Sequence, residues 1–357
     1  MNQKIPLGLS YDDVLLIPRR SNISSRGQVE LSTKITPRVR LSVPLISVNM
    51  TDVTGIEMAM VMAKLGGLGL IPRFVSAEEQ ADMVAKVKKE AGLVGAAVGC
   101  RNGAMQRAEM LVKAGAKVLT LDVAHAHMQK ALEATGELKR RFGSLVDIIS
   151  GVVATKEGAR DLFKAGADSV RVGVGPGTIC ITRLVTGVGV PQITAVMQAA
   201  EVARRFKKTI LCDGGAKNSG DIVKALAAGA SAVIAGSLYA GTDEAPGEKI
   251  EKDGRLYKVY NASTSLTEKK NHIKNMGEVL PPNYSKQIEG VESIVPYKGP
   301  VAKVVENLTA GIRSGLSYSG AKNISELWKK ARFIQVTSVG LKENGVHDVI
   351  LTKSPYN

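Results

Sequence analysis

Residues 169–183 read SVRVGVGPGTICITR, a short strand-like run followed by a glycine-rich loop that contains one cysteine. The β-branched run 169–172 predicts a strand, and the three glycines within 173–177 let backbone N–H groups approach an anion. Cys180 follows in the same loop, where N–H dipoles stabilise a thiolate and favour covalent chemistry. The stretch therefore predicts a strand that ends in a phosphate-binding and nucleophilic loop.

Two plainer interpretations of this loop are a dinucleotide fingerprint and a buried structural thiol. The fingerprint needs the pattern GxGxxG and an acidic residue about 20 positions later. This loop spells GxGxG, and residues 194–196 are Thr-Ala-Val. A classical dinucleotide-binding site is therefore disfavoured, whereas a structural role for the Cys180 thiol stays open on the loop sequence alone.

Seven further strand-like segments lie on either side of this loop, separated by helical patterns. The eight expected strands span 43–48, 67–71, 94–98, 117–121, 146–150, 169–172, 209–212 and 232–235. The expected helices between them cover 55–65, 77–91, 104–114, 127–141, 156–165, 193–206 and 219–228. Apolar strands that alternate with amphipathic helices indicate a parallel sheet covered by helices. Eight such units predict an α/β fold of the (β/α)8 TIM-barrel type, with a doubly wound open sheet as the alternative.

One long excursion, residues 244–298, follows the eighth expected strand and shows no helical core pattern. It begins with a hairpin-like piece at 249–260 that turns at Asp253-Gly254. Excursions of this length in a compact domain often form lids, so we expect residues 261–294 to be mobile until a ligand binds. Helical patterns return at 300–315 and 324–332. We therefore expect residues 1–357 to form a single barrel domain with a flap at 244–298.

Composition narrows the class of protein. The 357 residues carry a formal net charge of +15, but the basic residues are scattered and aromatic residues make up only 4%. We therefore expect anionic small substrates rather than nucleic acid. No apolar run reaches the ~18 residues of a membrane span, and the N-terminus lacks the apolar core of a signal peptide. Three cysteines without C-x-x-C spacing argue against zinc and disulfides and indicate a cytoplasmic location.

Five motifs together resemble those of the IMP dehydrogenase/GMP reductase family, from about Leu7 to the C-terminus. They are YDDVLLIP at 11–18, GVGPGTICITRLVTGVGVPQITAV at 173–196, DGGAKNSGDIVKALAAGA at 213–230, GSLYAGTDEAPGE at 236–248 and VPYKGPV at 295–301. The resemblance implies a (β/α)8 barrel, a homotetramer, and an oxidoreductase that acts on a purine nucleoside monophosphate. It also implies NAD or NADP as the cofactor and K+ as an accessory ion.

The resemblance further implies a role for each matching residue. Cys180 is the nucleophile that attacks purine C2, and Thr182 and Glu289 handle protons beside it. Asp213 holds the substrate ribose, and Asp122 holds the nicotinamide ribose of the cofactor. The other substrate-binding residues are Met50 and the 5′-phosphate set Thr178, Gly215, Gly236, Ser237 and Tyr260. The backbone carbonyls expected to hold the monovalent cation belong to Gly175, Gly177 and Cys180.

The reaction expected from this resemblance is the NAD-dependent oxidation of IMP to XMP in guanine nucleotide metabolism, through a covalent bond between Cys180 and purine C2. The alternatives are NADPH-dependent reductive deamination of GMP to IMP, and a catalytically weak nucleotide-binding homologue.

Three departures from the usual dehydrogenase pattern keep these alternatives open. The regulatory pair of cystathionine-synthase-type domains is absent after the helix at 77–91. No arginine lies between Arg255 and Arg313 to form the flap Arg-Tyr pair, and residues 262–264 read Ala-Ser-Thr instead of Gly-Met-Gly.

Overall fold

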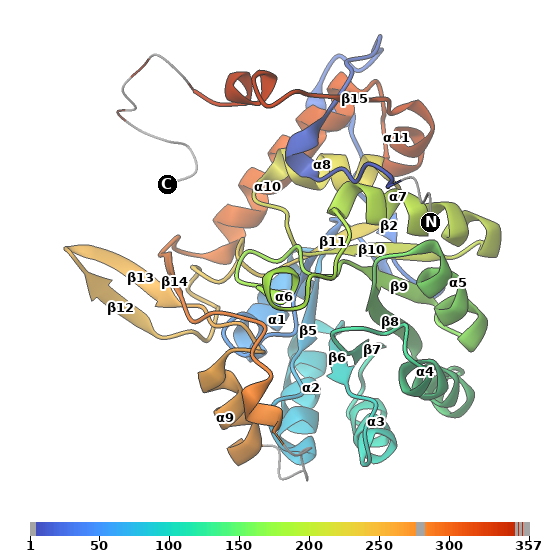
Figure 1. Cartoon of the computed structure of the whole chain (residues 1–357), viewed down its shortest axis with the longest axis vertical. Helices are drawn as coiled ribbons and strands as arrows, with labels where there is room; N and C mark the ends of the chain where they lie inside the picture. The colour runs from blue at the N-terminus through green and yellow to red at the C-terminus, as the bar shows by residue number, and fades with distance from the viewer. Residues whose placement is uncertain (1–4, 276–282, 347–348, 350–351, 353–357) are drawn as a thin grey trace.

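The computed structural model of the chain describes residues 5–275, 283–346, 349 and 352, and its eight central strands close into a parallel barrel (Figure 1). These strands are β4 (Leu45–Ser47), β5 (Leu68–Ile71), β6 (Gly95–Val98), β7 (Val118–Asp122), β8 (Asp147–Val153), β9 (Ser169–Val172), β10 (Thr209–Asp213) and β11 (Ala232–Ala235). β11 pairs back onto β4, with Val233 opposite Leu45. This closure confirms the expected barrel and excludes the open doubly wound sheet.

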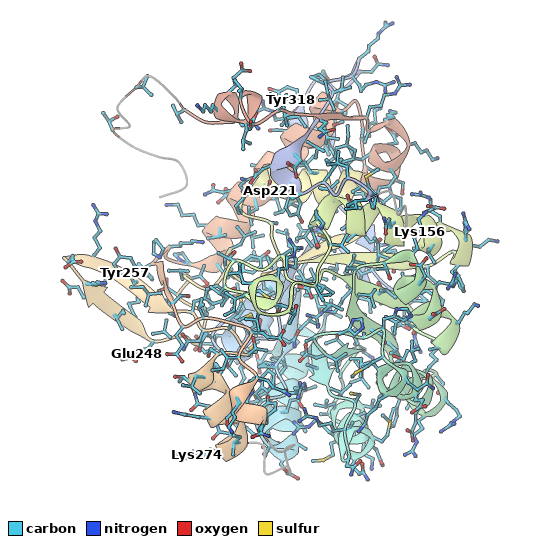
Figure 2. The ribbon with its side chains drawn as sticks, viewed as in Figure 1. Lys156, Asp221, Glu248, Tyr257, Lys274 and Tyr318 are labelled. Carbon is cyan, nitrogen blue, oxygen red and sulfur yellow. The ribbon has the colours of Figure 1, made fainter. Side chains whose placement is uncertain are left out.

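Helices form a ring around the barrel, as the sequence predicts. They are α1 (Ile56–Lys64), α2 (Ala77–Ala91), α3 (Ala104–Lys113), α4 (Gln129–Phe142), α5 (Lys156–Ala165), α7 (Gln192–Phe206), α8 (Ser219–Ala227), α10 (Val301–Tyr318) and α11 (Ile324–Lys330). Lys156, labelled in Figure 2, is the first residue of α5 and forms an ion pair with Glu201 on the neighbouring helix α7. None of the helices that the structure describes combines the length and the apolar content that a membrane span requires.

The α2 helix shows how local chemistry sets the element boundaries. The Ser76 side chain accepts a hydrogen bond from the Glu79 N–H at the start of the helix. Gly92 ends the helix in the left-handed conformation, with φ of 77°, which glycine adopts without strain. Only residues 92–94 separate α2 from β6. The chain therefore passes directly from helix to strand, and no domain is inserted at this point.

The flap contains more regular structure than the sequence patterns indicate. The expected hairpin is present as β12 (Lys249–Lys252) and β13 (Arg255–Val259), and β14 (Ile294–Pro296) adds a third antiparallel strand. Figure 1 shows this sheet pointing away from the barrel. Asp253 and Gly254 both have positive φ, of 52° and 69°, as a tight hairpin turn requires.

Although the sequence of 244–298 shows no helical core pattern, the flap contains one helix in its described part, α9, which spans Leu266–Asn275. This helix buries Glu268, Lys269 and His272 instead of an apolar stripe, so hydrophobic periodicity did not reveal it. The His272 ring stacks on Phe74 with 3.6 Å between the ring centroids, and the Thr51 hydroxyl donates to Glu268 at 2.7 Å. Polar and aromatic contacts therefore attach α9 to the barrel loops. Residues 276–282 of the predicted mobile segment lie outside the described residues.

Short elements outside the barrel join the two ends of the chain. β1 (Val14–Leu16) pairs antiparallel with β15 (Phe333–Gln335), and β2 (Thr33–Lys34) pairs with β3 (Arg40–Leu41). The η1 turn (Tyr11–Asp13) places Tyr11 against the end of β10, where its hydroxyl lies 3.0 Å from the Cys212 sulfur. The first motif of the sequence thus supports the loop that follows β10.

Candidate active site

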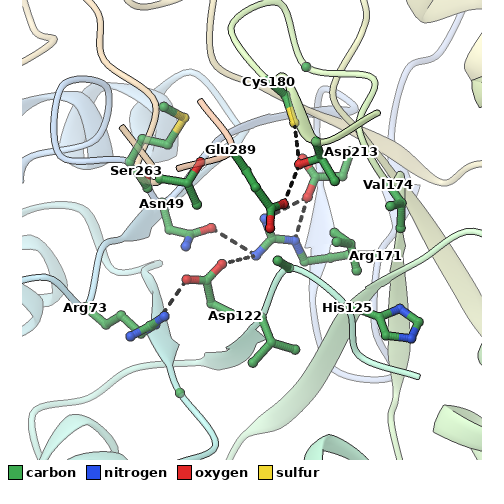
Figure 3. Close-up of a pocket in the computed structure, with 18 of the residues that line it drawn as sticks. Asn49, Arg73, Asp122, His125, Arg171, Val174, Cys180, Asp213, Ser263 and Glu289 are labelled. Carbon is green, nitrogen blue, oxygen red and sulfur yellow. Dashed lines mark hydrogen bonds and ion pairs between the residues drawn. The ribbon is translucent and has the colours of Figure 1, made fainter. Parts of the chain in front are cut away.

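The carboxyl ends of the barrel strands and the flap enclose a cavity of about 560 Å³ (Figure 3). Catalytic residues of this fold come from the loops at that end. Most of the residues that the sequence analysis assigns to substrate, cofactor, cation or chemistry line this one cavity. They are Met50, Asp122, Gly175, Gly177, Cys180, Thr182, Asp213 and Glu289.

The predicted nucleophile and the predicted proton-handling pair are joined in a hydrogen-bonded chain. The Cys180 thiol donates to the Thr182 hydroxyl with 3.1 Å between Sγ and Oγ1, and that hydroxyl donates to Glu289 with 2.8 Å between Oγ1 and Oε2. Backbone pairing holds the flap in place, since the Ile181 N–H donates to the Glu289 carbonyl at 2.9 Å. A proton can therefore pass between the reacting centre and a carboxylate through one hydroxyl group.

Arg171 lies between the two carboxylates that the sequence analysis assigns to ribose binding (Figure 3). Its Nη2 is 2.7 Å from Oδ2 of Asp213, and its Nη1 is 3.7 Å from Oδ1 of Asp122. The same Nη1 donates to the Asn49 amide oxygen at 2.9 Å. On the far side of Asp122, Nε of Arg73 donates to the carboxylate at 3.1 Å.

Burial and neighbouring cations act differently on the two carboxylates. Burial opposes the ionisation of Asp122, but Arg73 and Arg171 together outweigh it and hold the pKa of Asp122 below its usual value. Burial dominates at Asp213 and raises its pKa despite the Arg171 contact, and the charge of Asp122 adds to the rise. The difference arises because Asp122 contacts two cations, whereas Asp213 contacts one.

The residues predicted to hold the 5′-phosphate gather beside this cavity. The Thr178 hydroxyl donates to the Ser237 hydroxyl at 3.1 Å, which joins the loop after β9 to the loop after β11. A Cβ atom at Gly236 would lie 2.5 Å from the Tyr260 hydroxyl oxygen, so only glycine fits there. Gly215 has φ of 84° and adjoins the same loops. Glycine at these two positions has no side chain that would keep an anion away from the backbone.

The predicted cation site fits a monovalent ion in its ligand type, because carbonyl oxygens are hard ligands. The Gly177 carbonyl already accepts the Cys180 N–H at 3.1 Å, and the Arg183 side chain lies against Gly175. Three carbonyls do not complete the coordination shell of a cation, so further oxygen ligands would be needed. Across residues 5–275, 283–346, 349 and 352, no group of three or more His, Cys, Asp or Glu side chains is arranged for a metal.

Sequence reasoning gave no role to Arg171, Arg73 or Asn49, although each contacts a predicted ribose-binding carboxylate or its arginine partner. One signal was available for Arg171, which interrupts the apolar strand at 169–172. A charged side chain inside a strand of a parallel sheet is buried and must therefore be paired. The partners themselves could not be read from the sequence, because they come from other strands.

The cysteine loop and the two carboxylates thus meet in one cavity at the carboxyl end of a closed parallel barrel. Residues 8–347 match the family model described as the IMP dehydrogenase / GMP reductase domain, and the chain belongs to this family. The family comprises two kinds of oxidoreductase, which act on purine nucleoside monophosphates and use NAD or NADP.

Similar proteins carry the names of both enzymes. Inosine-5′-monophosphate dehydrogenase of Aquifex aeolicus is 35% identical, with 100% of this chain and 99% of the relative covered. GMP reductase of Leishmania donovani is 32% identical, with 97% and 98% covered. A solved structure of a Trypanosoma brucei GMP reductase variant in complex with guanosine 5′-monophosphate has a TM-score of 0.91 and 32% identity, with 97% and 99% covered. The names alone therefore do not distinguish the two reactions.

Proposed function

We propose that the chain oxidises IMP to XMP through a covalent bond between Cys180 Sγ and purine C2, with NAD as the hydride acceptor. The hydrogen-bonded chain Cys180–Thr182–Glu289 carries this proposal, because the reaction needs both a thiol and a proton acceptor at C2. The 35% identity to a named dehydrogenase over the full chain adds support.

The chain's own residues account for the proton transfers. The Cys180 sulfur bonds to C2 as the electron pair of the C2–N3 double bond moves to N3, which takes up the thiol proton, so Glu289 stays ionised for the later hydrolytic step. Bound NAD would accept the hydride that leaves C2. A water molecule then adds to C2 of the covalent adduct and loses a proton through Thr182 to Glu289. The C–S bond breaks, and the electron pair returns to the Cys180 sulfur as XMP forms.

The arrangement also accounts for binding and orientation. Asp213 would accept hydrogen bonds from the ribose hydroxyls of IMP, and Thr178 and Ser237 would donate to its 5′-phosphate. Asp122 would accept from a ribose hydroxyl of the dinucleotide. Arg73, Arg101 and Lys269 line the same cavity, and their positive charges suit the pyrophosphate of that ligand. The residues present therefore fit NAD or NADP.

A second candidate is the reductive deamination of GMP to IMP. The sequence contains no arginine between Arg255 and Arg313, so the flap has no guanidinium to activate water. Glu289 could instead deliver a proton, through Thr182, to the ammonia that leaves C2. The structural likeness to a GMP reductase holding guanosine 5′-monophosphate favours the same candidate.

Nicotinamide absorbance separates the candidates in one experiment. Purified protein is incubated with IMP and NAD, and separately with GMP and NADPH, with Cys180→Ala as the control. We expect absorbance to rise with IMP and NAD in the wild type only. Loss of absorbance with GMP and NADPH, without turnover of IMP, would replace the dehydrogenase proposal with the reductase. No turnover of either pair, with binding intact, would indicate a catalytically weak homologue.

We further propose that the active unit is a homotetramer whose chains each fold as one domain, and that K+ supports turnover. Light scattering should report four chains, and unfolding should be a single cooperative transition. Replacing K+ with Li+ should lower the turnover rate.

A further inference from the structure

Among the residues that the structure describes, Arg171 is the only cationic side chain that forms an ion pair with Asp213. It also lies next to Asp122. Its Nε and Nη2 both approach Oδ2 of Asp213, at 2.9 and 2.7 Å, while Nη1 points to Asn49 and Asp122. Only 5% of the Arg171 side chain is exposed. The planar guanidinium therefore fixes the relative positions of two carboxylates on different strands, β7 and β10 (Figure 3).

Arg73 differs from Arg171 in a way that can be used experimentally. Arg73 contacts Asp122 at 3.1 Å, and the structure gives it no contact with Asp213. Its side chain is 21% exposed at the edge of the cavity. Arg73 therefore supports the Asp122 half of the site alone, whereas Arg171 spans both halves.

We propose that Arg171 is a positioning residue that couples the binding of the nucleoside monophosphate to the binding of the dinucleotide. The inference rests on the proposed function, in which Asp213 binds the ribose of the first ligand and Asp122 that of the second. Ribose hydroxyls that donate to Asp213 restrict this carboxylate and therefore the guanidinium plane beside it. Asp122 is then already oriented when the dinucleotide binds, so the second binding step loses less conformational entropy. Binding is consequently cooperative, and the effect is reciprocal.

The test measures the Kd of NAD with and without saturating IMP, and the Kd of NADPH with and without GMP. All proteins carry Cys180→Ala so that no turnover occurs. In the protein that carries Cys180→Ala alone and so keeps Arg171, we expect the bound nucleoside monophosphate to lower the Kd of the dinucleotide by about fivefold or more. Arg171→Lys keeps the charge but loses the planar fork, and the ratio of the two Kd values should fall to within about twofold of one. Arg73→Lys should weaken dinucleotide binding and leave the ratio unchanged.

A second variant protects the test against misfolding. Asn49→Ala removes the amide oxygen that orients Nη1 but retains Arg171 and both carboxylates, and it should lower the ratio by at least about twofold. An unchanged ratio in both Arg171→Lys and Asn49→Ala would overturn the inference, as would an equal loss in Arg73→Lys. The inference would also be overturned if the protein with Cys180→Ala alone showed no coupling between the two ligands. If this protein bound neither IMP nor GMP, the result would instead contradict the proposed function.

Discussion

The Thr182 hydroxyl donates a hydrogen bond of 2.8 Å to the Glu289 carboxylate, which lies 107 positions later in the chain. The contact is held by backbone pairing, because Ile181 and Val291 donate to the carbonyls of Glu289 and Ile179 at 2.9 and 3.1 Å. The flap therefore holds the Glu289 carboxylate in a defined position beside the loop that carries Cys180. Any base that acts at C2 through Thr182 depends on this pairing.

Glu289→Gln should slow the hydrolysis of the covalent adduct by ~10²-fold or more, the contribution expected of one general acid–base group. The amide keeps the size of the side chain but cannot accept the proton. Pre-steady-state kinetics with IMP and NAD should still show the burst of hydride transfer while steady-state turnover falls. Glu292→Gln is the control, because Glu292 accepts a hydrogen bond from the Thr267 N–H on the same flap. Loss of the burst with hydrolysis unaffected would exclude Glu289 as the base.

Alkylation should distinguish Cys180 from the buried Cys212. Cys180 is partly exposed in the cavity, whereas burial raises the pKa of the Cys212 thiol to about 11 and keeps it protonated. We expect iodoacetamide to modify Cys180, to be blocked by bound nucleotide and to spare Cys212, as read by peptide mass spectrometry. Cys180→Ala should abolish turnover and retain nucleotide binding. More than a few per cent of the wild-type rate in that variant would contradict the covalent mechanism.

The phosphate group should contribute much of the nucleotide affinity. Charge-assisted hydrogen bonds contribute ~1.5–3 kcal/mol each, so inosine should bind at least tenfold more weakly than IMP. Ser237→Ala should reduce this difference, because it removes a hydroxyl from the Thr178–Ser237 pair and leaves the ribose-binding Asp213 intact. Calorimetry with both ligands on both proteins measures the effect. Equal affinity of the wild type for inosine and IMP would refute the assignment of the whole phosphate set.

Asp52, which contacts the flap through Asn261, should make the free energy of unfolding depend on pH. Its carboxylate accepts the Asn261 N–H at 2.8 Å, and burial raises its pKa to about 6, above its unfolded value. The folded state therefore binds a proton more tightly, and this contribution to stability is lost as pH rises from about 4 to about 6. Asp52→Asn keeps the acceptor and avoids the buried charge. Because the side chain is only partly buried, we expect a gain of about 1 kcal/mol at pH 8 and little change at pH 4.

Thermal unfolding at pH 4, 6 and 8 measures this effect. Asp12→Asn is the matched control, because Asp12 is exposed and pairs with Lys217. A variant Asp52→Asn that is destabilised at pH 8 would show that the carboxylate is favourable as an ion there, contrary to the prediction.

The order of strands and helices could be predicted from sequence because it depends on local patterns. The run 232–235, Ala-Val-Ile-Ala, is apolar on both faces, which suits a strand enclosed by helices. This run and the β-branched run 169–172 both form strands with the predicted bounds. The position of Cys180 at a strand end could be inferred for the same reason. Parallel strands in a barrel all end at one rim, so the cavity residues follow from topology.

Only the tertiary structure determined which charged side chains contact one another. Arg171, Asp122 and Asp213 lie on three strands, and their contacts depend on the stagger between strands after the barrel closes. The position of Glu289 beside Thr182 depends likewise on the path of the flap, and α9 was missed because it buries charged groups that pair with barrel loops. Hydrophobic periodicity reports on faces that exclude water, whereas these polar contacts depend on distances between residues remote in the chain.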